Sequence, residues 1–249
     1  MPFASILRKG GHFAWRRMSK EKRLKLLESL GLFTLKNALW HLQRNGFVPS
    51  LVVDVGANTG HWSQWTHSVF PLASFFLVDA DPANAPSLHN VCNSLPQCKF
   101  SISLLGPESR QAVTFYQMGS GSSVLPERTS NSRQVLELPM STLDQVVTTN
   151  SPGPILLKLD VQGFELEILR GANQLLAKTE VVIIECSLIE YNTGAPLIAD
   201  VLSFMRDRGF VFYDICGCSR RFQDEVLFQI DAVFVREGSD LRKPFRPNA

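Results

Sequence analysis

The chain has 249 residues, of which 45% are hydrophobic and 19% are charged; these values are ordinary for a globular protein and allow one large α/β domain or two small ones. No stretch approaches the roughly 18 apolar residues of a membrane span, and the first residues lack the apolar core of a signal peptide, so we expect a soluble, cytoplasmic protein. The net charge of +2 hides an asymmetry, because residues 1–48 hold ten lysines and arginines against two acidic residues.

We interpret residues 1–48 as a basic, helical N-terminal segment and residues 49–249 as the main domain. Residues 19–48 predict one or two helices, with Ser19 as an N-cap and Gly46 as a C-cap. One interpretation is a helical cap packed on the edge of a sheet. The alternative is a basic amphipathic surface for peripheral contact with a membrane, an anionic glycan or a partner protein.

Apolar runs rich in Val, Ile and Phe recur along the main domain, and helical patterns separate them. Continuous hydrophobicity predicts strands that are covered on both faces, and the alternation with helices predicts a doubly wound α/β sheet. The expected strands are 51–55, 74–79, 155–160, 181–186 and 209–214, with a further strand at 112–116 and a last one within 225–236. The expected helical stripes are 62–69, 164–176 and 197–205.

The five cysteines form an odd set without a CxxC pair, which argues against a disulfide framework and a zinc knuckle. We therefore expect buried or incidental thiols. The pair formed by Cys216 and Cys218 is the one that merits a test for metal binding or redox behaviour.

The stretch "LVVDVGANTG", residues 51–60, ends a predicted strand in a glycine-rich turn. Ligands of open α/β sheets bind beyond the carboxyl ends of the strands, so Asp54, Gly56, Asn58 and Gly60 are candidate cofactor-binding residues. The glycines permit close backbone approach, and Asn58 tolerates a left-handed conformation. The spacing does not supply the GxGxxG fingerprint, which disfavours a nicotinamide or flavin dinucleotide.

Asp79 ends the next apolar run and is placed to accept hydrogen bonds from the two hydroxyls of an adenosine ribose. A glycine-rich turn combined with an acid on the second strand fits adenosine without a diphosphate, as in S-adenosylmethionine. Asp54 is placed to orient the cationic methionine end of that cofactor, directly or through water. Ser103, which follows the next apolar segment, completes the candidate cofactor set.

These residues resemble the FkbM family of S-adenosylmethionine-dependent methyltransferases from about Asn45 to Arg236. The resemblance rests on "VDVGANTGHWS" (53–63), "VDADP" (78–82), "STLDQV" (141–146), "ILLKLDVQGFELEILRGA" (155–172) and "VVIIE" (181–185). It implies the class I methyltransferase fold, which is Rossmann-like and has a doubly wound seven-stranded sheet with an antiparallel last strand. It also implies a methyltransferase domain over 49–249 that O-methylates a hydroxyl of a sugar, a glycan or a secondary metabolite.

The chain departs from the family pattern at two positions. The second strand usually ends in Glu, where this chain has Asp79, whose shorter side chain should still reach a ribose. The fourth-strand motif usually reads Asp-x-Glu-Gly, where this chain has Gln162. Any role of that Glu as a base or a metal ligand therefore does not carry over.

Methyl transfer to an alcohol needs a positioned group that orients the acceptor and takes its proton. Asp160, at the carboxyl end of the fourth strand, is the first candidate for this role. Glu165 is a second candidate catalytic carboxylate or a residue that caps the following helix. Lys158 should point to the same face as Asp160, either for catalysis or for a salt bridge.

Three further interpretations concern the surroundings of Asp160. We expect no metal ion, and a divalent ion bound by Asp160 and Glu185 is the alternative. His61 is either a base or a residue that covers the cofactor. The hydroxyl-rich segment 118–131 is either a linker or a binding loop whose Ser120, Ser122 and Ser123 line the acceptor pocket.

Other functions stay open at this point. An N-methyltransferase acting on nucleic acid or protein is one, although the turn "DVQG" differs from the Asn/Asp-Pro-Pro-aromatic turn of amino-methylating enzymes, and we expect no nucleic acid partner. A non-catalytic module that binds the cofactor is another. A dehydrogenase is disfavoured by the missing dinucleotide fingerprint.

Overall fold

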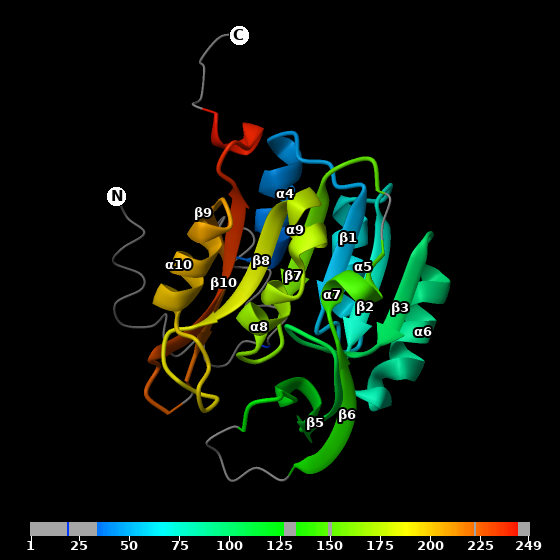
Figure 1. Cartoon of the computed structure of the whole chain (residues 1–249). Helices are drawn as coiled ribbons and strands as arrows, with labels where there is room; N and C mark the ends of the chain where they lie inside the picture. Colours follow the sequence, from blue (N-terminus) through cyan, green and yellow to red (C-terminus); the bar gives the residue numbers. More distant parts are fainter. Residues whose placement is uncertain (1–18, 20–33, 127–132, 149–150, 222, 244–249) are drawn as a thin grey trace.

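A seven-stranded sheet forms the centre of the protein in a computed structural model that describes residues 19, 34–126, 133–148, 151–221 and 223–243 (Figure 1). The strand order is β3-β2-β1-β7-β8-β10-β9. Among the described strands of this sheet, β10 alone runs antiparallel to both of its neighbours. The strands are β1 (Leu51–Val55), β2 (Ser74–Asp79), β3 (Cys98–Ile102), β7 (Ile155–Leu159), β8 (Thr179–Ser187), β9 (Phe210–Arg220) and β10 (Leu227–Arg236). The predicted doubly wound sheet with an antiparallel last strand is confirmed.

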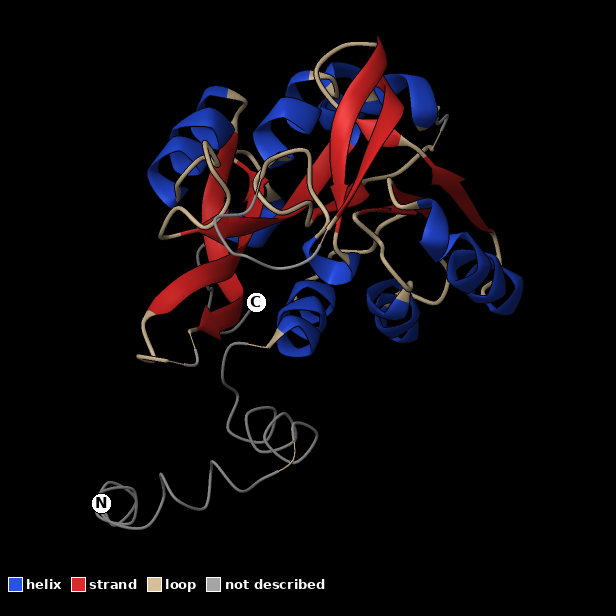
Figure 2. Ribbon diagram, turned by 90° about the horizontal axis from the view of Figure 1, so that it is seen from below, coloured by secondary structure: helices blue, strands red, loops and turns tan. Residues whose placement is uncertain are grey.

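Helices cover both faces of the sheet, as the two views show (Figure 2). Val52 and Leu156 pack into one core layer, whereas Val53 and Leu157 pack into the opposite layer. Every second residue of a central strand therefore meets a different layer, which explains the continuous apolar runs. The first layer holds α4 (Leu35–Arg44), α5 (His61–Val69) and α6 (Ala85–Ser94); the second holds α7 (Leu143–Val146), α8 (Glu165–Arg170), α9 (Asn173–Lys178) and α10 (Ile198–Asp207).

The apolar stripe predicted over 164–176 faces one core layer, but two separate helices, α8 and α9, carry it in place of one. Gly171 ends α8, and a Cβ atom at this position would lie 2.4 Å from the carbonyl oxygen of Gly106. The close backbone contact fixes the break between the helices. Asp144 then accepts hydrogen bonds from the backbone N–H groups of Gln174 and Leu175, which caps the start of α9.

A small three-stranded sheet with the order β4-β6-β5 projects from the main sheet (Figure 1). Its strands are β4 (Leu104–Leu105), β5 (Arg110–Gln117) and β6 (Gln134–Ser141). The predicted strand at 112–116 lies within β5. Leu104, Phe115 and Met140 form a separate small core beneath this sheet. Short 3-10 turns occur at η1 (Pro82–Asn84), η2 (Gly119–Gly121) and η3 (Asp240–Arg242).

The described end of the N-terminal segment is α4, which packs on the sheet. Thr34 caps its start, and Gly46, with φ of 90°, follows its end. Leu39 and Leu42 are buried in the same core layer as Val52. The helix predicted over residues 20–33 lies outside the described residues, so the division at residue 48 stays a prediction.

The cysteines differ from the expectation. Cys92 of α6 and Cys98 at the start of β3 form a disulfide, which their odd number and spacing did not predict. Cys186 and Cys216 are buried free thiols, and Cys218 is exposed. Separately, none of the helices described combines the length and the apolar character that a bilayer span requires.

Candidate active site

A cavity of about 740 Å³ lies at the carboxyl ends of β1, β2, β7 and β8. Its volume falls within the range of about 300–1,000 Å³ that is usual for small-molecule sites. The small sheet and the segment after β5 form its outer wall. Residues of the lining that matter below are Asn58, Asp79, Ser103, Ser120, Asp160, Gln162, Glu185, Tyr191, Phe228 and Gln229.

The turn after β1 needs its glycines for different reasons. Gly56 has φ of 76°, and a Cβ atom there would lie 1.9 Å from the carbonyl oxygen of Asp160, so the turn touches the end of β7. Asn58 has φ of 50°, the left-handed conformation that its sequence position predicted. Gly60 caps α5 with φ of 78°, and a Cβ atom there would lie 2.9 Å from Val91, so this glycine serves the packing of α5 on α6.

Asp79 lies at the cavity edge of β2 and is held by three N–H groups. Its Oδ2 accepts from the backbone N–H of Asn58 at 2.6 Å, and its Oδ1 accepts from the backbone N–H of Asp81 at 2.8 Å and from Asn84 Nδ2 at 3.1 Å. Burial raises the pKa of Asp79, and these donors oppose the rise. Because a carboxylate oxygen has two acceptor sites, Oδ2 can still accept one further hydrogen bond. Ser103 lines the cavity beside it and donates its backbone N–H to the Asp79 carbonyl at 2.8 Å.

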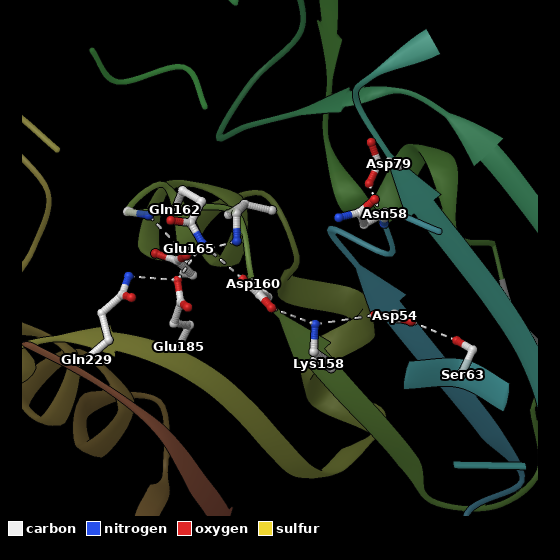
Figure 3. A network of polar contacts seen from close by, with 12 residues as sticks. Asp54, Asn58, Ser63, Asp79, Lys158, Asp160, Gln162, Glu165, Glu185 and Gln229 are labelled. Carbon is white, nitrogen blue, oxygen red and sulfur yellow. Dashed lines mark hydrogen bonds and ion pairs between the residues drawn. The ribbon is translucent and has the colours of Figure 1, made fainter. Parts of the chain in front are cut away.

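Asp54 lies behind the cavity wall and is fully buried. Its Oδ2 accepts from Ser63 Oγ at 2.7 Å, and its Oδ1 lies 3.6 Å from Lys158 Nζ (Figure 3). Lys158 Nζ lies 3.2 Å from Asp160 Oδ2. Burial alone would lower the pKa of Lys158, but the carboxylates of Asp160 and Asp54 outweigh it and raise this pKa, so Lys158 keeps its charge. Asp54 is therefore linked through Lys158 to Asp160, which lines the cavity.

Asp160 directly follows β7, and its side chain, 34% exposed, faces the cavity. Gln162 Nε2 donates to Asp160 Oδ1 at 3.3 Å and to Glu185 Oε2 at 2.8 Å. Gln229 Nε2 donates to the same Glu185 oxygen at 3.1 Å. Figure 3 shows one chain of contacts from Ser63 of α5 to Gln229 of β10, which runs through residues of β1, β7, the turn after β7, and β8.

Glu165 is not among the described residues that line the cavity. Its side chain is buried, and Oε1 accepts from the backbone N–H groups of Val161 at 3.0 Å and Gly163 at 3.1 Å. These bonds hold the sharp turn in which Gln162 and Gly163 both have positive φ. Burial raises the pKa of Glu165 to about 7. Glu165 thus holds the turn that precedes α8.

The three serines of the segment after β5 all line the cavity, but they differ in how far their hydroxyl groups are engaged within the protein. Ser123 is buried and donates its hydroxyl to the Gln162 carbonyl at 3.0 Å. Ser122 accepts from the Met118 backbone N–H at 2.8 Å within its own turn. Ser120 is exposed, so its hydroxyl is the freest of the three to meet a ligand. His61 lies instead at a second cavity of about 290 Å³, on the α5 side of Asp160.

The sequence analysis did not identify the residues that β10 and the segment after β8 place at the cavities. Gln229 and the ring pair formed by Tyr191 and Phe228, with centroids 5.7 Å apart, line the main cavity. Asp231 lies opposite Gly217, where a Cβ atom would lie 1.8 Å from its Oδ2. Burial and Asp160 raise the pKa of Asp231 to about 6, against the opposing effect of Lys158. The sequence signal that could have identified Asp231 is an acidic residue inside the apolar run of the last strand.

No metal-binding group of three or more His, Cys, Asp or Glu side chains occurs within the described parts of the chain. The pair that could hold a divalent ion, Asp160 and Glu185, is instead bridged by the amide of Gln162. The amide nitrogen supplies the hydrogen-bond donors that two neighbouring carboxylates need.

Comparison with known proteins gives a family. The sequence matches the Methyltransferase FkbM domain over residues 54–212. A search of curated proteins finds no match. Similar solved structures include the magnesium protoporphyrin IX methyltransferase of Synechocystis PCC 6803 with bound SAH (14% identity, TM-score 0.47, 93% of this chain and 97% of that one). Others are an rRNA methylase of Streptococcus thermophilus (11%, 0.43, 80% and 93%) and a TehB-like SAM-dependent methyltransferase of Corynebacterium glutamicum (11%, 0.41, 87% and 95%).

Proposed function

Because the chain belongs to the FkbM methyltransferase family, we propose that it transfers a methyl group from S-adenosylmethionine to a hydroxyl group of a sugar, a glycan or a secondary metabolite. The observation that carries this proposal is the single cavity whose lining includes both Asp79 and Asp160. One carboxylate is suited to the cofactor and the other to the acceptor. The cavity volume suits a small-molecule ligand.

The cofactor half of the cavity fits adenosine. Asp79 Oδ2 retains an acceptor site for a ribose hydroxyl, and Asn58 and Ser103 border the same space. Gly56 lets the turn after β1 pass close to the end of β7, which keeps the cofactor half next to Asp160. When bound, S-adenosylmethionine supplies an electrophilic methyl group on a sulfonium.

The acceptor half fits a hydroxyl that must be oriented and deprotonated. Asp160 is the catalytic residue of the proposal, since its carboxylate faces the cavity at the end of β7. It would orient the acceptor hydroxyl toward the cofactor half of the cavity and accept the hydroxyl proton. A positioned base of this kind contributes about 10²- to 10⁴-fold in rate.

Three residues position Asp160 from outside the cavity. Lys158 binds its Oδ2, and Asp54 balances the charge of Lys158 from β1. Glu165 holds the turn that follows Asp160 through the N–H groups of Val161 and Gly163. In this proposal Lys158, Asp54 and Glu165 act through Asp160 and do not touch the substrate.

Calorimetric titration with S-adenosylmethionine, with and without magnesium, tests the two roles. Asp79→Ala should weaken binding about 10- to 100-fold, because a hydrogen bond to a charged group is worth about 1.5–3 kcal/mol. Asp160→Ala should leave the affinity within about threefold, and Asp207→Ala, on the exposed end of α10, is the control for removing a carboxylate. Wild-type protein that binds no S-adenosylmethionine would overturn the proposal.

A further inference from the structure

The main cavity is acidic. Its charged lining residues, within the described part of the chain, are Asp79, Asp160 and Glu185, and no Lys, Arg or His is among them. The nearest cation of the network, Lys158, has a side chain only 9% exposed and is engaged by Asp54 and Asp160. An anionic acceptor would therefore meet carboxyl groups and no cationic side chain among the described lining residues.

The acceptor wall also has a one-sided hydrogen-bonding character. Gln162 donates its two amide hydrogens to Asp160 and Glu185, and Gln229 donates one amide hydrogen to Glu185. Within the described chain, the Oε1 atoms of Gln162, Glu185 and Gln229 make no hydrogen bond. Carboxylate and amide oxygens accept hydrogen bonds, so this wall suits a ligand that donates several of them.

Aromatic rings lie on the same cavity. Tyr191 and Phe228 have ring centroids 5.7 Å apart and are tilted by 38°. Aromatic side chains give a small-molecule site its apolar area, while a few polar groups fix the orientation of the ligand. A ring-shaped polyol combines the two requirements, because it has apolar C–H faces and a rim of hydroxyl donors.

We propose that the wall formed by Asp160, Gln162, Glu185 and Gln229 restricts the methyl acceptor to uncharged or amino-substituted polyols, and that it rejects acceptors bearing a carboxylate or phosphate. This inference rests on the proposed function and names the substrate class of the same site. Glu185 is the specificity-determining residue, because it accepts hydrogen bonds from the two amides and is the second carboxyl group of the wall beside Asp160. Asp160 keeps its catalytic role whichever polyol binds.

Saturation-transfer NMR with matched methyl glycosides tests the charge selection. The probes are the neutral glycosides, the 2-amino sugars and the uronates of the gluco, galacto and manno series. They are measured with the full chain in the presence of S-adenosylhomocysteine, so that no turnover occurs. We expect neutral or amino members to bind, and the matching uronates to bind at least tenfold more weakly. Uronates that bind as well as their neutral partners, or a complete lack of binding by neutral and amino members, would overturn the inference.

The variant Glu185→Gln separates charge selection from a structural role. It keeps the size of the side chain and should narrow the difference between neutral and uronate ligands to less than threefold, whereas Asp207→Asn should leave the difference unchanged. An unchanged difference in Glu185→Gln would remove Glu185 as the selecting group. Binding of S-adenosylhomocysteine is recorded in the same samples, so a failed cofactor site, which would sink the proposed function itself, is distinguished from a failed acceptor wall.

Discussion

The proposed cofactor and acceptor halves of the cavity are anchored in different ways. Asp79, in the cofactor half, is bound by two backbone N–H groups and one side chain, whereas Glu185, in the acceptor half, is bound by two side-chain amides. Backbone donors are fixed by the course of the chain, and side-chain donors change with a single substitution. The comparison teaches that the fold itself sets the cofactor half, while individual side chains set the acceptor half.

The largest effect should come from breaking the ion pairs by which Lys158 links Asp54 of β1 to Asp160 in the acceptor half. Lys158→Met leaves Asp54 buried without a counter-charge, and we expect a loss of about 3–5 kcal/mol in the free energy of unfolding. Urea denaturation measures this loss. Combining the change with Asp54→Asn should recover most of it, since no uncompensated charge then stays buried. A loss below about 1 kcal/mol would show that the halves are stable without this connection.

The next effect concerns Glu165, the buried carboxyl that holds the turn after Asp160 through backbone N–H groups. The pKa of Glu165 is raised from 4.5 to about 7, so the folded state holds a proton that the unfolded state has already released. Stability from this group is therefore lost as the pH rises from about 5 to 7, by about 3 kcal/mol in total. Glu165→Gln should still accept both backbone N–H bonds and should lack this loss.

Unfolding free energies of wild type and Glu165→Gln at pH 5 and pH 8 measure the difference. The two proteins should be similar at pH 5, and the variant should be more stable at pH 8. An equal difference at both pH values would mean that the Glu165 carboxyl does not titrate in this range. The result sharpens the comparison, because it tells whether the backbone anchoring of the turn behind the acceptor half depends on the charge of Glu165.

A smaller effect should follow when a carboxylate replaces the Gln162 amide that bridges Asp160 and Glu185. Gln162→Glu removes the two amide donors and brings a third carboxylate beside Asp160 and Glu185, so we expect a loss of about 1–3 kcal/mol at pH 8. Because repulsion raises the carboxyl pKa values in the folded state, the loss should shrink as the pH falls.

Magnesium or manganese should also restore the thermal stability of Gln162→Glu, since both ions accept carboxylate oxygens as ligands. Gln162→Leu, which adds no charge, is the control and should not respond to either ion. A variant Gln162→Glu that is insensitive to pH and to both ions would contradict the view that the amide separates two carboxylates by its donors.

The sequence predicted the cofactor half far better than the acceptor half. Asp79 and Asn58 stand at the ends of neighbouring strands in a recognisable motif, and the left-handed turn at Asn58 is a local property. Gln229, by contrast, meets Glu185 only because β10 inserts antiparallel beside β8, 44 positions later in the chain. No local pattern encodes such a pairing.

Other differences between prediction and structure have the same origin. The break between α8 and α9 depends on the contact of Gly171 with the backbone of Gly106, and the disulfide depends on how α6 leads into β3. Asp231 was recognisable as an acid in an apolar strand, but its neighbours were not. Tertiary contacts decide these features, whereas periodicity and turn chemistry decide the strands and the cofactor turn.

The small sheet has a consequence for protein engineering. β5 and β6 pair with each other, and β6 also pairs with β4, while no ladder hydrogen bond joins them to the seven-stranded sheet among the described residues. The hairpin nevertheless supplies Phe115 and the segment around Ser120 to the cavity. Grafting a different hairpin between β4 and α7, or building a library in it, is therefore a way to recruit new methyl acceptors while the cofactor scaffold is left intact.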